Sequence, residues 1–260
     1  MRTRHFIIAP LAAATSFALA GAAIAAPAVA LTGEKTLVMF DTETLAVSGT
    51  MEVTGVDRLE GIDVRPADQM LYGVAADGSI VTIDTASGVA TKKSMLSQAL
   101  PTGVGALVDF NPVADRMRLV GTDGTNLRVN VDDGMVTVDG TLAYDGADMH
   151  AGETPAIVAV AYTNSVGKPE ATAMYDIDAT IVALIQQAPP NDGVLKAVGK
   201  LGIDGAANYA FDIAATADLA NTAYLVAGST LHTVALDTGA ATAVGDLAIE
   251  GSIRDIAILP

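Results

Sequence analysis

The sequence predicts an all-β fold, a single five-bladed β-propeller, from three observations. Short runs of alternating apolar and polar residues, rich in β-branched types, fill the chain after residue 25. A turn signature recurs on average every 49 residues. One further repeat is split between the two ends of the chain. Four short strands in a repeat of this length are typical of propeller blades.

The turn signature is an aspartate that directly follows an apolar strand. Such an aspartate accepts hydrogen bonds from backbone N–H groups two residues further on, and a following glycine supplies positive φ. The five aspartates are Asp41, Asp84, Asp132, Asp178 and Asp237. Their separations are 43, 48, 46 and 59 residues. An extra loop over residues 186–195, with Pro189-Pro190 and Asn191-Asp192-Gly193, explains the longest step.

A second signature, an aspartate within a strand, marks the start of each repeat. Ile62-Asp63-Val64-Arg65-Pro66 matches Val108-Asp109-Phe110-Asn111-Pro112, and Asp212 and Asp255 occupy the same position later. The third copy, Ala161-Tyr162-Thr163-Asn164, lacks the acid. We expect this strand to be the innermost of each blade, with blades that begin near residues 59, 105, 157, 209 and 252.

The last blade is expected to combine both ends of the chain. Only one strand follows residue 252, while residues 29–41 match the second and third strands of the first blade. Pairing of the N- and C-terminal strands would close the ring and leave no open edge. The main alternative is a β-sandwich, for which shorter and less self-similar spacing is expected. Little helix is expected, apart from a turn or two over residues 92–99.

Residues 1–25 are expected to be a signal peptide, followed by a single propeller domain over residues 26–260. Arg2 and Arg4 precede an apolar segment over residues 6–21, and Ala23-Ile24-Ala25 forms a small-residue cleavage site. Pro27 disfavours cleavage after Ala26. Because Pro10 interrupts the apolar segment, it is a poor membrane span. We expect an exported protein, periplasmic or secreted, with no membrane insertion after cleavage.

The composition excludes several classes of function. The 30 acids against 14 bases disfavour nucleic acid as a partner, since phosphate binding needs a basic surface. The absence of cysteine excludes disulfides, zinc–thiolate sites and thiol catalysis. Only His150 and His232 follow the leader, which excludes a histidine-cluster metal site. No catalytic residue is assigned, and whether the protein is an enzyme stays open.

The second blade carries the most distinctive stretches of the chain. They are Asp109-Phe110-Asn111-Pro112, Asp115-Arg116-Met117-Arg118-Leu119-Val120 and Gly124-Thr125-Asn126-Leu127-Arg128-Val129-Asn130. In these and in Pro189-Pro190-Asn191-Asp192-Gly193 the chain resembles a bacterial secreted family that is known only as domain of unknown function 4394. The resemblance covers nearly all residues from 37 to 260. It implies an exported propeller-type protein and no established activity.

The same blade concentrates basic and amide side chains. Arg116, Arg118 and Arg128 lie within 13 residues and could bind a carboxylate or a sugar diol together with amides. The interpretation that we favour is ion pairing between neighbouring blades. Tyr162 could stack on a sugar or pack in the core. The candidate binding residues are Asn111, Asp115, Arg116, Arg118, Asn126, Arg128, Tyr162 and Asn164.

The repeated strand aspartates are the candidate metal ligands. If Asp63, Asp109, Asp212 and Asp255 met in the central channel, their carboxylates would repel one another unless a hard cation such as calcium neutralised them. We favour a structural role, in which each accepts hydrogen bonds from a turn or a neighbouring arginine. The sequence requires no cofactor.

Three classes of function remain. The first is a binding module for an envelope or extracellular protein or a glycan, with its site at one end of the channel. The second is a cation-dependent hydrolase or lyase at the same place, and the third is a structural protein of the envelope or matrix. A monomer is compatible with all three, because a closed propeller has no unpaired edge to satisfy.

Overall fold

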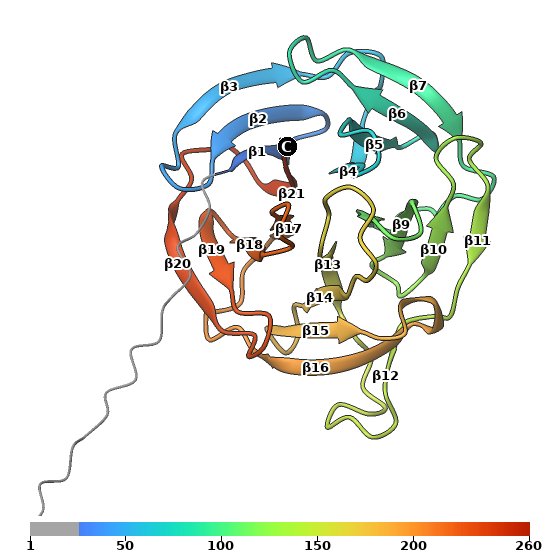
Figure 1. The fold of residues 1–260 in the computed structure, drawn as a ribbon, viewed down its shortest axis with the longest axis vertical. Coiled ribbons are helices and arrows are strands. Elements are labelled where there is room, and N and C mark those ends of the chain that lie inside the picture. Colours follow the sequence, from blue (N-terminus) through green and yellow to red (C-terminus); the bar gives the residue numbers. More distant parts are fainter. Residues whose placement is uncertain (1–25) are drawn as a thin grey trace, which may run out of the picture.

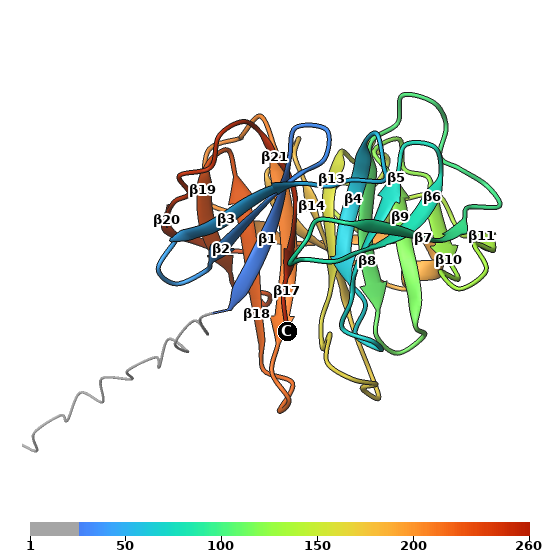
Figure 2. The same cartoon turned by 90° about the horizontal axis from the view of Figure 1, so that it is seen from above.

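Five β-sheets surround a central axis in the computed structural model, which describes residues 26–260 (Figure 1). The expected signal peptide lies outside these described residues. The sequence prediction of an all-β, five-bladed propeller is confirmed. Seen from the side in Figure 2, the inner strands run along the axis and the outer strands cross it obliquely. Among residues 26–260, no helix is long and apolar enough to cross a membrane.

Each blade is numbered here in chain order, and its strands are given from the axis outward. Blade 1 contains β4 (Leu59–Val64), β5 (Leu71–Ala75), β6 (Ser79–Ile83) and β7 (Ala90–Met95). Blade 2 contains β8 (Ala106–Asn111), β9 (Arg116–Gly121), β10 (Asn126–Val129) and β11 (Val136–Val138). Blade 3 contains β13 (Ile157–Tyr162), β14 (Met174–Asp178), β15 (Ala183–Gln187) and β16 (Val194–Lys200). Blade 4 contains β17 (Tyr209–Ala215), β18 (Asn221–Ala227), β19 (Thr230–Val234) and β20 (Ala241–Asp246).

Blade 5 joins the two ends of the chain, as the repeat pattern predicts. Its innermost strand is β21 (Ile253–Ile258), followed outward by β1 (Pro27–Thr32), β2 (Thr36–Asp41) and β3 (Val47–Glu52). Strand β1 pairs antiparallel with β21, with Val29 opposite Ala257. The ring is therefore closed by a sheet whose strands come from opposite ends of the sequence.

Two local features differ from expectation. Residues 92–99 contain no helix, because β7 occupies Ala90–Met95 and pairs with β6. Lys92 and Lys93 are exposed there, since β7 is an outermost strand and charges on such an edge discourage pairing with other chains. Strand β12 (Ala143–Tyr144) was not expected: it pairs parallel with β16 and gives blade 3 a fifth strand.

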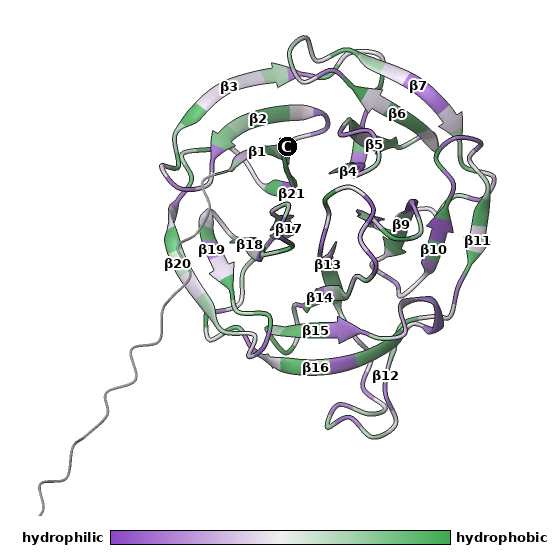
Figure 3. Ribbon diagram, viewed as in Figure 1, coloured by the Kyte–Doolittle hydropathy of each residue, from purple (hydrophilic) through white to green (hydrophobic). Residues whose placement is uncertain are grey.

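The apolar core lies between neighbouring blades. Phe110 of blade 2 packs edge to face against Tyr72 of blade 1, with ring centroids 5.3 Å apart. Hydrophobic residues dominate strands such as β13 and β21, while the outer strands β7 and β16 mix both kinds (Figure 3). This arrangement leaves one edge of each innermost strand facing the channel, where its N–H groups need acceptors.

Candidate functional site

The four repeated aspartates lie on innermost strands, one in each blade except blade 3. Each carboxylate accepts a hydrogen bond from a backbone N–H of the innermost strand in the following blade. Asp63 accepts from Phe110 at 2.7 Å, and Asp109 accepts from Tyr162 at 3.1 Å. The contacts from Asp212 to Ile258 N (2.6 Å) and from Asp255 to Ile62 N (2.9 Å) complete the series. The aspartates therefore satisfy strand edges that no further strand covers.

Blade 3 lacks this acid, and a pair of asparagines makes its link to blade 4. The backbone N–H of Asn164 donates to Asn221 Oδ1 at 2.7 Å, and Asn221 Nδ2 donates to Asn164 Oδ1 at 2.8 Å. Asn164 adopts a left-handed conformation with φ of 62°, which asparagine tolerates better than most residues. The structure thus gives this candidate binding residue a role in joining two blades.

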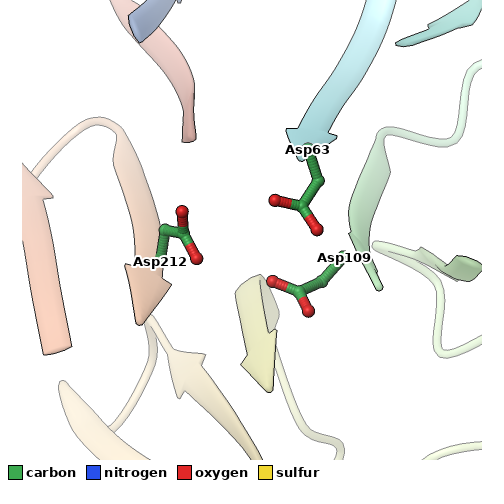
Figure 4. A group of neighbouring side chains, drawn as sticks. All are labelled: Asp63, Asp109 and Asp212. Carbon is green, nitrogen blue, oxygen red and sulfur yellow. The ribbon is translucent and has the colours of Figure 1, made fainter. Parts of the chain in front are cut away.

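Three of the four carboxylates converge in the channel. Asp63 from β4, Asp109 from β8 and Asp212 from β17 are all buried, and each offers an oxygen within 4.8 Å of the others (Figure 4). We call these three residues the carboxylate cluster; Asp255 is not part of it. Among residues 26–260, no hydrogen bond reaches Asp109 Oδ2.

Burial and mutual repulsion act on the protonation of these acids. Burial raises the pKa of Asp63 and of Asp109 well above the ordinary value, and the other carboxylates raise it further. Burial also raises the pKa of Asp212 to about 6 and that of Asp255 to about 8. No lysine, arginine or histidine in the described part of the chain forms an ion pair with any of the four. The described residues thus give these carboxylates backbone N–H donors but no ion pair.

A pocket of about 180 Å³ opens beside the cluster, and we call it the mouth pocket. Asp63 and Asp212 line it, whereas Asp109 does not. Its walls come from the ends of β4, β17 and β21 and from residues 165–167, and most of them are apolar, including Val64, Ile213 and Ile258. The cluster is thus reached from one end of the channel through a small, largely apolar pocket.

Arg118 is at the centre of a buried polar network between blades 2 and 3. Its side chain is 1% exposed. It donates to Asp139 at 2.7 Å, to Asn126 Oδ1 at 2.9 Å, to Asn191 Oδ1 at 2.8 Å and to the Tyr162 hydroxyl at 3.2 Å. We call these five residues the interblade network. The ion pair of Arg118 with Asp139 lies within blade 2, so the interpretation of ion pairing between blades is wrong for Arg118, which reaches blade 3 through hydrogen bonds to Asn191 and Tyr162.

Of the remaining candidate binding residues, Asp115 forms an ion pair between two blades, and the others make contacts within blade 2. Asp115 holds Arg65 of blade 1 through two hydrogen bonds of 2.8 and 2.7 Å. Arg116 donates to the carbonyl of Asp115 at 2.7 Å, and Arg128 contacts Asp139 at 2.6 Å. Asn111 accepts two backbone N–H groups within its own turn.

Sequence reasoning missed Arg65 and Asp139, which neutralise charges in this region. Arg65 stands two residues after Asp63 in the repeated signature, at the position that Asn111 occupies in blade 2. No repeat position distinguishes Asp139, whose role emerges only from the pairing of β9, β10 and β11 within blade 2.

The fold and the site together define a five-bladed β-propeller with buried carboxylates on its innermost strands. The chain belongs to the domain-of-unknown-function family DUF4394, whose family model matches residues 36–257. This confirms the resemblance found in the sequence.

Comparison with solved structures supports the fold. A structural-genomics protein of unknown function from Bacteroides thetaiotaomicron is similar, with a TM-score of 0.55 and 17% identity over 88% of this chain and 63% of that one. The chain thus spans somewhat less than two thirds of that protein. A protein of unknown function from Bacteroides caccae gives a TM-score of 0.46 at 10% identity, over 87% of this chain and 75% of that one. A comparison with curated proteins finds no match.

Proposed function

We propose that this protein is a binding module that takes a hard divalent cation, calcium in the first instance, at the carboxylate cluster. One observation carries the proposal: three buried carboxylates converge within 4.8 Å and have no basic partner among the described residues. Buried charges without a partner are strongly unfavourable. A bound cation would remove this penalty without requiring three protons.

The chemistry of the donors fits such an ion. Calcium takes about six to eight oxygen ligands, and carboxylates are among its preferred ones. Asp63, Asp109 and Asp212 would supply three or more of these oxygens. The mouth pocket would give access, and oxygen atoms of a partner, an envelope protein or a glycan, would complete the coordination there. The leader expected over residues 1–25 would deliver the module to the periplasm or to the medium.

The test is thermal unfolding of residues 26–260, which comprise all five blades, in EDTA and in calcium, magnesium or manganese. A cation at about 100 times its dissociation constant should stabilise the protein by about 2.7 kcal/mol. Asp109→Asn keeps an acceptor for the Tyr162 N–H but removes a ligand, so it should abolish this shift. Asp255→Asn is the matched control, because Asp255 makes the same kind of interblade hydrogen bond outside the cluster. An unchanged melting temperature with all three ions would overturn the proposal.

The same variants address the enzyme alternative. The cation-loaded protein would be assayed for hydrolysis of ester and glycoside substrates. Turnover that disappears in Asp109→Asn and persists in Asp255→Asn would move the protein from the binding class to the hydrolases.

A further inference from the structure

A second buried acid lies away from the channel and lacks any hydrogen bond. Asp176, in β14, has no exposed surface, and neither of its carboxyl oxygens has a partner in the described chain. The amide oxygen of Gln187, in β15, is also buried without a partner. Three acceptor oxygens are therefore left without a donor inside blade 3, where such groups are costly.

The strand register brings these two side chains to one face of the sheet. Asp176 lies opposite Ile185, and Gln187 lies opposite Met174, so the two are diagonal neighbours on adjacent antiparallel strands. Diagonal neighbours of this kind are within reach of long side chains. A single proton shared between them would convert one of the three orphan acceptors into a donor.

The charged groups around Asp176 do not provide that donor. Arg118 attracts it electrostatically, but within residues 26–260 every hydrogen bond of the guanidinium goes to another member of the interblade network. Asp139 already pairs with both Arg118 and Arg128. The Tyr162 hydroxyl contacts Arg118 and makes no hydrogen bond to Asp176, and Asp178, two residues along β14, accepts a hydrogen bond from Tyr144. An ionised Asp176 would thus be a buried charge without a single hydrogen bond.

We propose that Asp176 is a proton-binding site between blades 2 and 3: its carboxyl group stays neutral in the folded protein at neutral pH and donates its proton to Gln187 Oε1. This inference does not depend on the proposed cation site, because it concerns a different blade face and different residues.

The sign of the resulting pH dependence follows from linkage. Burial raises the pKa of Asp176 well above the ordinary value, and Arg118 offsets only part of this. The folded state therefore binds a proton that the unfolded chain releases above a pH of about 3.9. The contribution of Asp176 to stability is complete below that pH and is lost as the pH rises toward the folded-state pKa.

The experiment compares the wild-type chain with Asp176→Asn by urea unfolding from pH 4 to pH 9, in EDTA. Asparagine keeps a donor for Gln187 and cannot ionise. We expect the folding equilibrium constant of the wild type to fall relative to that of the variant by up to tenfold for each pH unit above about 4. Effects of the carboxylate cluster cancel in this ratio, since both proteins carry it.

A second measurement keeps the proposal testable if the variant does not fold. This is infrared difference spectroscopy at pH 7, with ¹³C-labelled aspartate, on a variant in which Asp63, Asp109, Asp212 and Asp255 are all Asn, because those buried acids have raised pKa values of their own. The spectrum should contain the carbonyl band of a protonated carboxyl group that exchanges slowly with D₂O. A ratio that stays constant with pH, or a spectrum with ionised carboxylates alone, would mean that Asp176 is charged and paired with a reoriented Arg118.

Discussion

At the scale of single residues, the aspartates of this protein do two different jobs. Of the turn aspartates, Asp41, Asp84 and Asp178 accept hydrogen bonds from backbone N–H groups two or three residues further on. Those on innermost strands, such as Asp63, are buried and bond the next blade. The sequence predicts the innermost-strand aspartates correctly, but its turn signature is wrong at Asp132, which pairs with Arg65 and Lys93 while Asn130 accepts the backbone N–H of the turn. Which side chains meet could not be predicted in the same way: Arg118 and Asn191 are 73 residues apart and meet only because blades 2 and 3 pack together.

The buried arginine yields a prediction on stability. Arg118→Ala should lower the free energy of unfolding by about 3–5 kcal/mol, because it leaves the buried Asn126, Asn191 and Tyr162 without this partner and leaves Asp139 with Arg128 alone. Arg116→Ala is the matched control on the same strand: Arg116 donates only to backbone carbonyls, and its loss should cost below about 1 kcal/mol. Urea unfolding measures both. Equal and small effects would favour the ligand-binding interpretation of this patch.

At the scale of elements, the repeat pattern located the innermost strand of every blade to within a residue. It failed for β7, where a helical turn or two was expected over residues 92–99 although the segment is an exposed edge strand. It also missed β12, because a two-residue parallel strand has no periodicity to detect. Strands that face solvent, or that contain only a few residues, have too little hydrophobic periodicity to be recognised in a sequence.

The turn between β10 and β11 provides a test of how closely blades approach at their rims. Gly134 has φ of 76°, and a Cβ there would overlap the carbonyl of Met95 in blade 1. Gly134→Ala should therefore destabilise the protein by more than the roughly 1 kcal/mol expected from the backbone conformation alone. Gly103→Ala is the control, since Gly103 has φ of 84° with open space around it. Equal losses of stability in the two variants, measured by thermal unfolding, would mean that the contact between blades 1 and 2 can shift at little cost in free energy.

At the scale of the whole molecule, an acidic chain places uncompensated carboxylates on its axis. The sequence predicted that four aspartates would lie on innermost strands, and the structure brings three of them together. The bonded N–H groups also differ in position: Asp255 accepts from Ile62, the residue before Asp63, whereas Asp63 accepts from Phe110, the residue after Asp109. The repeat in the sequence does not contain this difference.

These axial acids predict how stability depends on pH. Because their folded-state pKa values are raised, to about 6 for Asp212 and about 8 for Asp255, they stabilise the fold below a pH of about 3.9 and lose this effect as the pH rises through 6 and 8. The free energy of unfolding in EDTA should therefore decline between pH 4 and pH 8. Calcium should counter the decline increasingly at higher pH, when the cluster is deprotonated. A calcium effect that is the same at pH 5 and pH 8 in urea unfolding would contradict this.

The pairing of β1 with β21 also bears on how a population of chains assembles. The contact joins residues more than 220 positions apart, such as Val29 and Ala257, and contacts of this range form slowly. Until it forms, β1 and β21 each offer an unsatisfied edge of matching register. In a concentrated refolding mixture the β21 of one copy can fill the gap in another, and two rings then share their final strands. Slow dilution should yield monomers and rapid concentration should yield exchanged dimers, so that the history of the sample and not its composition decides its oligomeric state.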